Sequence, residues 1–288
     1  MRYRSLNDYI AASDGGVKGP VAVVVAEDAI ELDGTLRHNL SIGFRENVAL
    51  VPEGVAIGAD LADRVHEVRH DVFADGAVTG AVNRLIEALP GEWLYYCYNG
   101  EYLYFPFCET RNIREMLAFH AEERREAVIS YVIDLYAGDL SRYPDAVSVH
   151  EAMLDRSGYY ALGRTDPANG YQPRDRQMDF FGGLRWRFEE HVPWERRKID
   201  RIALFRTKPG LRLREDFTLT DEEMNTYACP WHNNITTAVM SFRTAKALRL
   251  NPGSRFAISD FRWRNSVPFR WHSQQLMDLG LMEPGQWF

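Results

Sequence analysis

A polar break inside a hydrophobic stretch, between residues 92 and 106, carries residue types that could bind a ligand. The pattern predicts a buried strand over Trp93–Cys97, a break at Tyr98-Asn99-Gly100, and a second strand that starts at Glu101. In α/β enzymes, polar and acidic residues that directly follow a strand lie at the carboxyl edge of the sheet, where ligands bind. The sequence therefore predicts a ligand site at this break, with a carboxylate beside it.

Alternating strands and helices are expected to position this break. The β-branched run Val21–Ala26 is typical of a central parallel strand that is buried on both faces. Residues Asp75–Ala88 carry apolar side chains at helical spacing. The other elements expected before the break are a helix over Thr35–Ile42 and strands over Asn47–Val51 and Val65–Val72. This order predicts an α/β fold with a mostly parallel, twisted sheet flanked by helices.

The rest of the chain is predicted with fewer regular elements. Residues 137–179 are rich in Gly, Pro, Asp and Tyr, and we expect them to be irregular. The elements expected elsewhere are a helix over Arg111–Arg125 capped by Thr110, strands over Ala127–Tyr136 and Ile199–Phe205, and helices over Ile235–Leu250 and Ser273–Leu279. An irregular C-terminal extension, from residue 251 to residue 288, should pack on the domain that precedes it.

The break resembles the nucleotide-sugar-binding strand of family 2 glycosyltransferases, which have the GT-A fold. That strand ends in D-x-D, and here Tyr98-Asn99-Gly100 stands in its place, so both carboxylates are replaced. The positions that agree with the family are Glu101, Tyr102, Leu103, Phe105 and Pro106. The resemblance covers roughly residues 20–250. It implies one GT-A-like domain over residues 1–250, with a nucleotide-binding half over about 20–106 and an acceptor half over about 107–250.

The resemblance also implies a nucleotide-sugar donor, a carbohydrate acceptor and a set of binding residues. The residues placed near the nucleotide are Ala26, Glu27, Asp28, Asn99, Gly100 and Trp231. Glu27-Asp28 departs from the family's Asn-Glu pattern, and a solvated turn at the strand end is the alternative interpretation. The family's cofactor is a manganese- or magnesium-like cation, for which His232 and Glu101 are the remaining candidate ligands. His232 could equally be a hydrogen-bonded structural residue.

Sugar transfer needs a group that neutralises the leaving diphosphate and a carboxylate that takes a proton from the acceptor. Arg185 and Arg187 open a run of basic residues, ending at Arg214, that could bind phosphate oxygens. The alternative is that these cations pair with nearby acids. Asp179 is the first candidate for the general base because the Gly-Gly pair at 182–183 allows a close approach. The other candidates are Asp175, Glu189, Glu190 and Glu101.

Tryptophans beside arginines are a further candidate feature for carbohydrate binding. They are Trp186, Trp231, Trp263 and Trp271. Aromatic faces can stack on the C–H faces of sugars, and arginines can stack on indoles. The alternative is an aromatic core with arginines whose charged ends reach solvent.

Composition limits the class of protein. The net charge of −7 and a pI of about 5.7 argue against a nucleic-acid-binding protein. Three cysteines without metal-ligand spacing are typical of a reduced, cytoplasmic protein. No apolar run reaches the roughly 18 residues that a transmembrane helix needs, and peripheral membrane contact stays open.

Two alternatives to a metal-dependent transferase remain. Loss of the D-x-D carboxylates would also fit a pseudoenzyme that keeps the fold to bind a glycan or a protein. A metal-independent transferase, in which the arginine-rich segment replaces the cation, is the other alternative.

Overall fold

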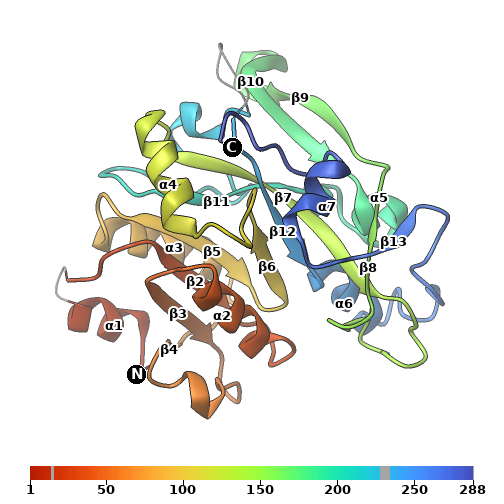
Figure 1. The fold of residues 1–288 in the computed structure, drawn as a ribbon, viewed down its shortest axis with the longest axis horizontal. Helices are drawn as coiled ribbons and strands as arrows, with labels where there is room; N and C mark the ends of the chain where they lie inside the picture. The colour runs from red at the N-terminus through yellow and green to blue at the C-terminus, as the bar shows by residue number, and fades with distance from the viewer. Residues whose placement is uncertain (14–15, 228–233, 288) are drawn as a thin grey trace. The chain divides into compact units, whose positions relative to one another are not determined.

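The chain folds as an α/β protein, as predicted, and its residues form two compact units. A computed structural model describes residues 1–13, 16–227 and 234–287. The first unit comprises residues Met1–Tyr102, Cys108–Val128 and Ile202–Asn225, and the second comprises Leu103–Phe107, Ile129–Arg201 and Thr226–Phe288. Each unit is built from segments far apart in sequence, so neither corresponds to one continuous stretch of chain (Figure 1).

The first unit is built on a mostly parallel sheet with the strand order β1-β4-β3-β2-β5-β11. Its strands are β1 (Arg2–Tyr3), β2 (Val21–Val25), β3 (Glu46–Val51), β4 (His66–Arg69), β5 (Trp93–Tyr98) and β11 (Asp200–Arg206), whose last five residues belong to this unit. All neighbouring pairs are parallel except β11, which runs antiparallel to β5. Every residue of β2 is buried, as expected for a central strand covered on both faces.

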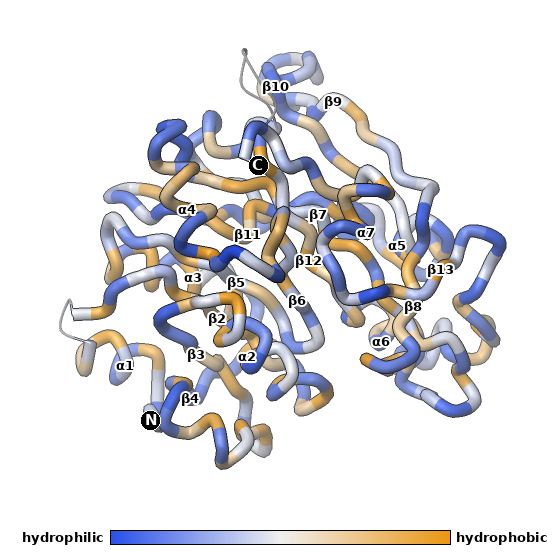
Figure 2. The backbone as a smooth tube through the Cα atoms, viewed as in Figure 1, coloured by the Kyte–Doolittle hydropathy of each residue, from blue (hydrophilic) through white to orange (hydrophobic). Residues whose placement is uncertain are grey.

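Four helices flank this sheet. They are α1 (Leu6–Ser13), α2 (Leu32–Ser41), α3 (Ala77–Ala88) and α4 (Ile113–Glu122). Helix α2 packs against β2 and β3, and α1 packs against α3 and β4 (Figure 1). Figure 2 shows the hydrophobic residues of β2 at the centre of this arrangement. The β-α-β order predicted between residues 21 and 106 is therefore confirmed.

The second unit centres on β7 (Ala127–Ala137), which belongs to it from Ile129 onward. Strand β12 (Thr237–Ser241) pairs parallel with β7, and β8 (Ala152–Asp155) pairs antiparallel with it. The other elements are β13 (Ser266–Pro268), the hairpin of β9 (Tyr160–Asp166) and β10 (Gln172–Phe181), and the helices α5 (Gly183–Arg187), α6 (Arg243–Leu250) and α7 (Ser273–Asp278). Strand β6 (Glu101–Tyr104) spans the change of unit after Tyr102.

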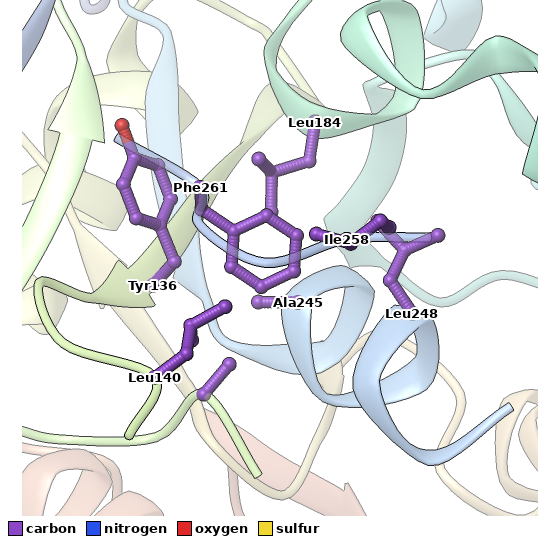
Figure 3. Close-up of a cluster of buried hydrophobic side chains, with 8 residues drawn as sticks. Tyr136, Leu140, Leu184, Ala245, Leu248, Ile258 and Phe261 are labelled. Carbon is purple, nitrogen blue, oxygen red and sulfur yellow. The ribbon is translucent and has the colours of Figure 1, made fainter. Parts of the chain in front are cut away.

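Residues beyond 250 contribute to the core of the second unit. Ile258 and Phe261 pack with Tyr136 of β7, Leu184 of α5 and Leu248 of α6 in one buried cluster (Figure 3). The rings of Tyr136 and Phe261 lie 5.8 Å apart, between centroids. The predicted C-terminal extension therefore supplies core side chains to this unit.

Three sequence-based expectations differ from the structure. The helix predicted over Ile235–Leu250 is wrong in its first half, because residues 237–241 form the buried strand β12 and the helix α6 begins only at Arg243. The stretch 137–179, predicted as irregular, contains β8, β9 and most of β10. Helix α4 is capped by Asn112, not by Thr110. The Asn112 side chain accepts hydrogen bonds from the backbone N–H groups of residues 114 and 115.

No helix among the described residues combines the length and the apolar character that crossing a bilayer requires.

Candidate functional site

The carboxyl ends of β2 and β5 lie side by side in the first unit. The two strands are parallel neighbours, with Val25 paired to Tyr98 in register. The segments that follow them, Ala26–Asp28 and Asn99-Gly100, therefore meet at one edge of the sheet. This juxtaposition brings together five of the residues that the sequence placed near a nucleotide.

The side chain of Asn99 connects the two strand ends. Its amide Nδ2 donates to the Asp28 carboxylate at 2.7 Å and to the Ile30 carbonyl at 2.8 Å. Its Oδ1 accepts from the backbone N–H of Glu27 at 2.8 Å. Asn99 is 0% exposed, whereas its partners Glu27, Asp28 and Ile30 are half-buried. Its observed role is to fix the loop after β2.

The loop between β2 and α2 is held at further points that the sequence did not indicate. The Thr35 hydroxyl accepts from the Gly100 N–H at 2.9 Å, and the Tyr102 hydroxyl donates to Glu31 Oε2 at 2.6 Å. A Cβ on Gly34 would lie 2.1 Å from the same Glu31 oxygen, so a larger residue there would displace the Glu31 carboxylate from Tyr102. In the sequence, Glu31 and Thr35 lie four positions apart at the start of a helix that follows β2. This spacing was the only sequence signal that these two side chains could contact residues 98–102.

The polar surface of this edge is acidic. Ala26 is fully buried, whereas Glu27 and Asp28 are half-buried. The Asp28 carboxylate is oriented by two donors to its Oδ1, the Asn99 amide and the Ile30 N–H at 2.8 Å. Carboxylates at a strand end accept hydrogen bonds from hydroxyl groups and repel phosphate. This edge is thus suited to a hydroxyl-bearing group and not to a phosphate.

Glu101 is buried and bonded to the backbone of its own turn. It is 1% exposed, and its Oε2 accepts from the Tyr98 N–H at 2.8 Å. The turn depends on Gly100, whose φ of +76° lies in the left-handed region. This carboxylate therefore closes the turn between β5 and β6. Its catalytic role stays a prediction.

The described residues do not fit a divalent cation. They contain no group of three or more His, Cys, Asp or Glu side chains arranged to hold one. At the break, the metal-binding positions of D-x-D are Tyr98 and Gly100, neither of which offers a carboxylate. His232 and Trp231 lie outside the described residues. No step through a metal is derived from this part of the chain.

Asp179, the predicted general base, belongs to a partly buried ionic network in the second unit. Its Oδ1 accepts from Arg164 Nε at 2.7 Å and lies 3.4 Å from Lys198 Nζ. Arg164 also donates to Asp200 Oδ2 at 2.7 Å. Burial raises the pKa of Asp200, and the charge of Arg164 opposes that rise.

Arg185 is held by partners within its own unit. Its Nε donates to Thr244 Oγ1 at 3.1 Å and lies 3.7 Å from Asp134 Oδ1. The other oxygen of Asp134 accepts from the Leu184 N–H at 2.8 Å. Burial raises the pKa of Asp134 despite these partners. Asp134 was missed by sequence reasoning, although a lone carboxylate in the apolar run of β7 was a signal for it.

Arg187 is paired with a second buried carboxylate. It lies 3.1 Å from Asp155 Oδ2, and its guanidinium carbon lies 4.8 Å from the ring centroid of Trp263. The Trp263 indole N–H and the Tyr136 hydroxyl donate to Asp155 Oδ1 at 2.7 and 2.5 Å. Arg187 and Trp263 therefore form a hydrogen-bonded aromatic cluster around Asp155, in which the charged end of Arg187 is buried and paired instead of reaching solvent.

Several other cations of the basic run also pair with acids. The pairs are Arg197 with Glu189 at 3.0 Å, Lys208 with Asp221 at 2.6 Å, Arg212 with Glu87 at 3.1 Å and Arg214 with Glu222 at 2.6 Å. Their charges are already compensated, which weakens the case for an arginine-rich phosphate site.

Comparisons with known proteins give no family. No protein-family model matches the sequence, and no curated protein matches it significantly.

Proposed function

We propose that this chain is a glycosyltransferase-like protein of GT-A type, which binds a nucleotide sugar at the carboxyl edge of β2 and β5. The observation that carries the proposal is the Asn99 side chain, which joins the two strand ends around Glu27 and Asp28. An open edge between adjacent parallel strands is the usual ligand position in α/β sheets. The motif from Glu101 to Pro106 supports the choice of ligand.

The residues at this edge have distinct roles in the proposal. The half-buried carboxylates of Glu27 and Asp28 accept hydrogen bonds from the ribose hydroxyls of the donor. Asn99 and Thr35 hold the loop in one conformation before the ligand arrives, which lowers the entropy lost on binding. Glu101, in the same unit as this edge, is the proposed carboxylate for the transfer step.

A second candidate function is binding without catalysis. It is favoured by the absence of the D-x-D carboxylates and by the engagement of Glu101 with the Tyr98 N–H. In this alternative, the same edge binds a nucleotide sugar or the fold serves assembly, and no bond is broken. A glycan- or protein-binding component of a larger assembly would have these properties.

Donor titration tests the proposal. Isothermal calorimetry with UDP-sugars, GDP-sugars and the free nucleotides, with and without Mn²⁺, should give saturable binding for at least one donor. Asp28→Asn should weaken that binding, because the amide loses an acceptor for a ribose hydroxyl. Asp63→Asn is the matched control, since Asp63 is an exposed acid of the same unit. Failure of every donor to bind would overturn the proposal.

Turnover separates the two candidate functions. Release of free nucleotide from the bound donor, measured with and without chelator, would establish transfer or hydrolysis. If Glu101→Gln abolishes release without changing donor affinity, the protein is an enzyme and the binding-only alternative fails. Donor binding without any release, over hours and with a range of glycan acceptors, would favour the alternative.

A further inference from the structure

The dipeptide Asn-Gly occurs twice in the chain, at Asn99-Gly100 and at Asn169-Gly170. In such a pair the glycine backbone nitrogen can attack Cγ of the asparagine amide, because glycine has no Cβ to hinder the approach. The new N–Cγ bond closes a succinimide ring, and the amide nitrogen leaves with the glycine proton as ammonia. Water then opens the ring at either carbonyl carbon and gives aspartate or isoaspartate. The sequence alone does not distinguish the two pairs.

The Asn99-Gly100 pair is held in a buried turn. The Asn99 amide nitrogen donates to Asp28 Oδ1 at 2.7 Å and to the Ile30 carbonyl at 2.8 Å. The Gly100 N–H, which would be the attacking group, donates to Thr35 Oγ1 at 2.9 Å. Both residues of the pair are buried. The leaving group and the nucleophile are therefore engaged elsewhere, and ring closure would first have to break these hydrogen bonds.

The Asn169-Gly170 pair lies in the turn of the hairpin between β9 and β10. Asn169 ends a single 3-10 turn, Pro167–Asn169, which contains no buried residue, and residues 167–173 are all exposed. Among the described residues, the Asn169 side chain has no hydrogen-bond or ion-pair partner. Gly170 has a φ of +60°, and nothing lies within 4 Å of the position that a Cβ would occupy. The Asn169 amide can thus rotate toward the Gly170 nitrogen in contact with water.

The side-chain and backbone contacts that close this turn are made by other residues. Asp166 Oδ1 accepts from the Ala168 N–H at 3.0 Å, and the Asp166 carbonyl accepts from the Tyr171 N–H at 2.8 Å. Arg174 Nη2 lies 3.3 Å from the same Asp166 oxygen, Oδ1. These contacts fix the ends of the turn around Asp166, and none of them restrains the Asn169 side chain.

We propose that Asn169 is a site of spontaneous deamidation, and that its hydrogen bonds protect Asn99 from the same reaction. At Asn169 the product aspartate adds a negative charge to an exposed turn. The product isoaspartate lengthens the main chain by a methylene group between Asp166 and Tyr171, whose backbone hydrogen bond closes the turn. At Asn99 the same reaction would set a further carboxylate beside Asp28, where the native amide is a hydrogen-bond donor.

The test follows both asparagines in one sample of the full chain. The protein is kept in mildly alkaline buffer at physiological temperature for several weeks. Aliquots are digested and mapped by mass spectrometry, with electron-transfer fragmentation to separate aspartate from isoaspartate. The Asn169 peptide should acquire both products at least about tenfold faster than the Asn99 peptide, because the reaction at Asn99 must first break buried hydrogen bonds. A parallel sample unfolded in guanidinium chloride should react at both positions at similar rates.

Gly170→Ala is the variant that tests the chemical step. The added Cβ hinders the attacking nitrogen and meets no neighbouring atom in the folded protein, so deamidation at Asn169 should slow by about tenfold or more. Gly210→Ala is the matched control, because Gly210 also has a positive φ, +79°, and nothing within 4 Å of its added Cβ. This control should leave the rate at Asn169 unchanged. Hydrogen exchange of the aged wild type should become faster in the turn 166–171 and stay unchanged in the first unit.

The possible results distinguish the site at Asn169 from the protection of Asn99. A folded protein in which Asn99 reacts as fast as Asn169 would overturn the protection. An Asn169 that stays intact while the unfolded chain reacts at this position would overturn the assignment of the site, and so would an unchanged rate in Gly170→Ala. None of these results depends on donor binding, because the reaction requires only water.

Discussion

The amide of Asn99 donates a 2.7 Å hydrogen bond to the carboxylate of Asp28, a residue 71 positions earlier in the chain. This contact locks the loop after β2 to the turn after β5. A neutral amide opposite an acid holds the edge together without adding a third negative charge near Glu27. The edge is therefore pre-shaped, and its half-buried carboxylates can face a ligand.

Removal of the Asn99 side chain should destabilise the first unit. Asn99→Ala leaves the Glu27 N–H and the Ile30 carbonyl without their partner at a half-buried edge, where water replaces the lost bonds only in part. An unpaired buried polar group costs about 1–3 kcal/mol, so we expect the free energy of unfolding, measured in urea, to fall by about 1–3 kcal/mol. The exposed Asn169→Ala is the control and should change it by less than about 0.5 kcal/mol. Equal stabilities for the two variants would contradict this role for Asn99.

A methyl group at Gly183 should disturb the buried carboxylate of Asp134. Gly183 has a φ of +63°, and its added Cβ would lie 2.7 Å from Asp134 Oδ2. Gly170 has nearly the same conformation, with a φ of +60°, but nothing lies within 4 Å of its added Cβ. Gly170→Ala should therefore show only the backbone strain of about 1–2 kcal/mol. Gly183→Ala should lower the free energy of unfolding, measured in urea, by more than Gly170→Ala does. An equal loss in the two variants would show that the Asp134 side chain can move away from the added methyl group without cost.

Loss of the Arg164 charge should leave the buried carboxylate of Asp200 without its ion-pair partner. Arg164 is 8% exposed and pairs with both Asp179 and Asp200. We expect Arg164→Met to lower the free energy of unfolding by about 3–5 kcal/mol, because Asp200 stays buried without its cation. Arg212→Met, which breaks an exposed pair with Glu87, should cost less than about 1 kcal/mol.

The loss in free energy of unfolding caused by Arg164→Met should depend on pH. Burial raises the pKa of Asp200 above its unfolded value, so the folded state binds this proton more tightly than the unfolded state does. A group of this kind contributes stability at low pH and loses it as the pH rises through the folded pKa. The difference in free energy of unfolding between the wild type and Arg164→Met should therefore be smaller at pH 4 than at pH 7. A deficit that grows on acidification would contradict a buried, uncompensated Asp200.

The buried imidazole of His120 should make the protein sensitive to acid. Burial, reinforced by the charge of Arg125, lowers the pKa of His120 to about 3. Neither ring nitrogen has a hydrogen-bond partner among the described residues. Because the folded pKa is depressed, the unfolded state binds the proton first. Stability is therefore lost as the pH falls from about 6.5 toward 3, by up to about 1.4 kcal/mol per pH unit.

The measurement is urea unfolding at pH 7 and pH 5. His120→Leu should lose less stability between these two values than the wild type does, by up to about 2 kcal/mol. The exposed His150→Leu is the control and should keep the wild-type difference. The same pH dependence in His120→Leu and the wild type would show that other groups cause the acid sensitivity.

The regular elements of the first unit could be predicted because their signals are local. The continuous β-branched run of β2 and the helical spacing of α3 each suffice to indicate an element. The meeting of residues 26–28 with residues 99–100 also followed from the β-α-β order, since parallel neighbours end at the same sheet edge. Strand β12 was missed because five small and apolar residues before a helix fit either periodicity.

What the sequence by itself determined is therefore the α/β class, the strand–helix order and the place of the candidate edge. Only the tertiary structure decided which polar side chains face that edge and which cations are already paired. Asn99 donates to Asp28, and Arg187 forms an ion pair with Asp155. In each pair the two residues are far apart in sequence, and the local pattern around one residue gives no information about the other. Hydrophobic periodicity repeats every few residues and can be seen in a short window. A polar side chain instead takes its partner from whatever long-range packing brings within about 3 Å.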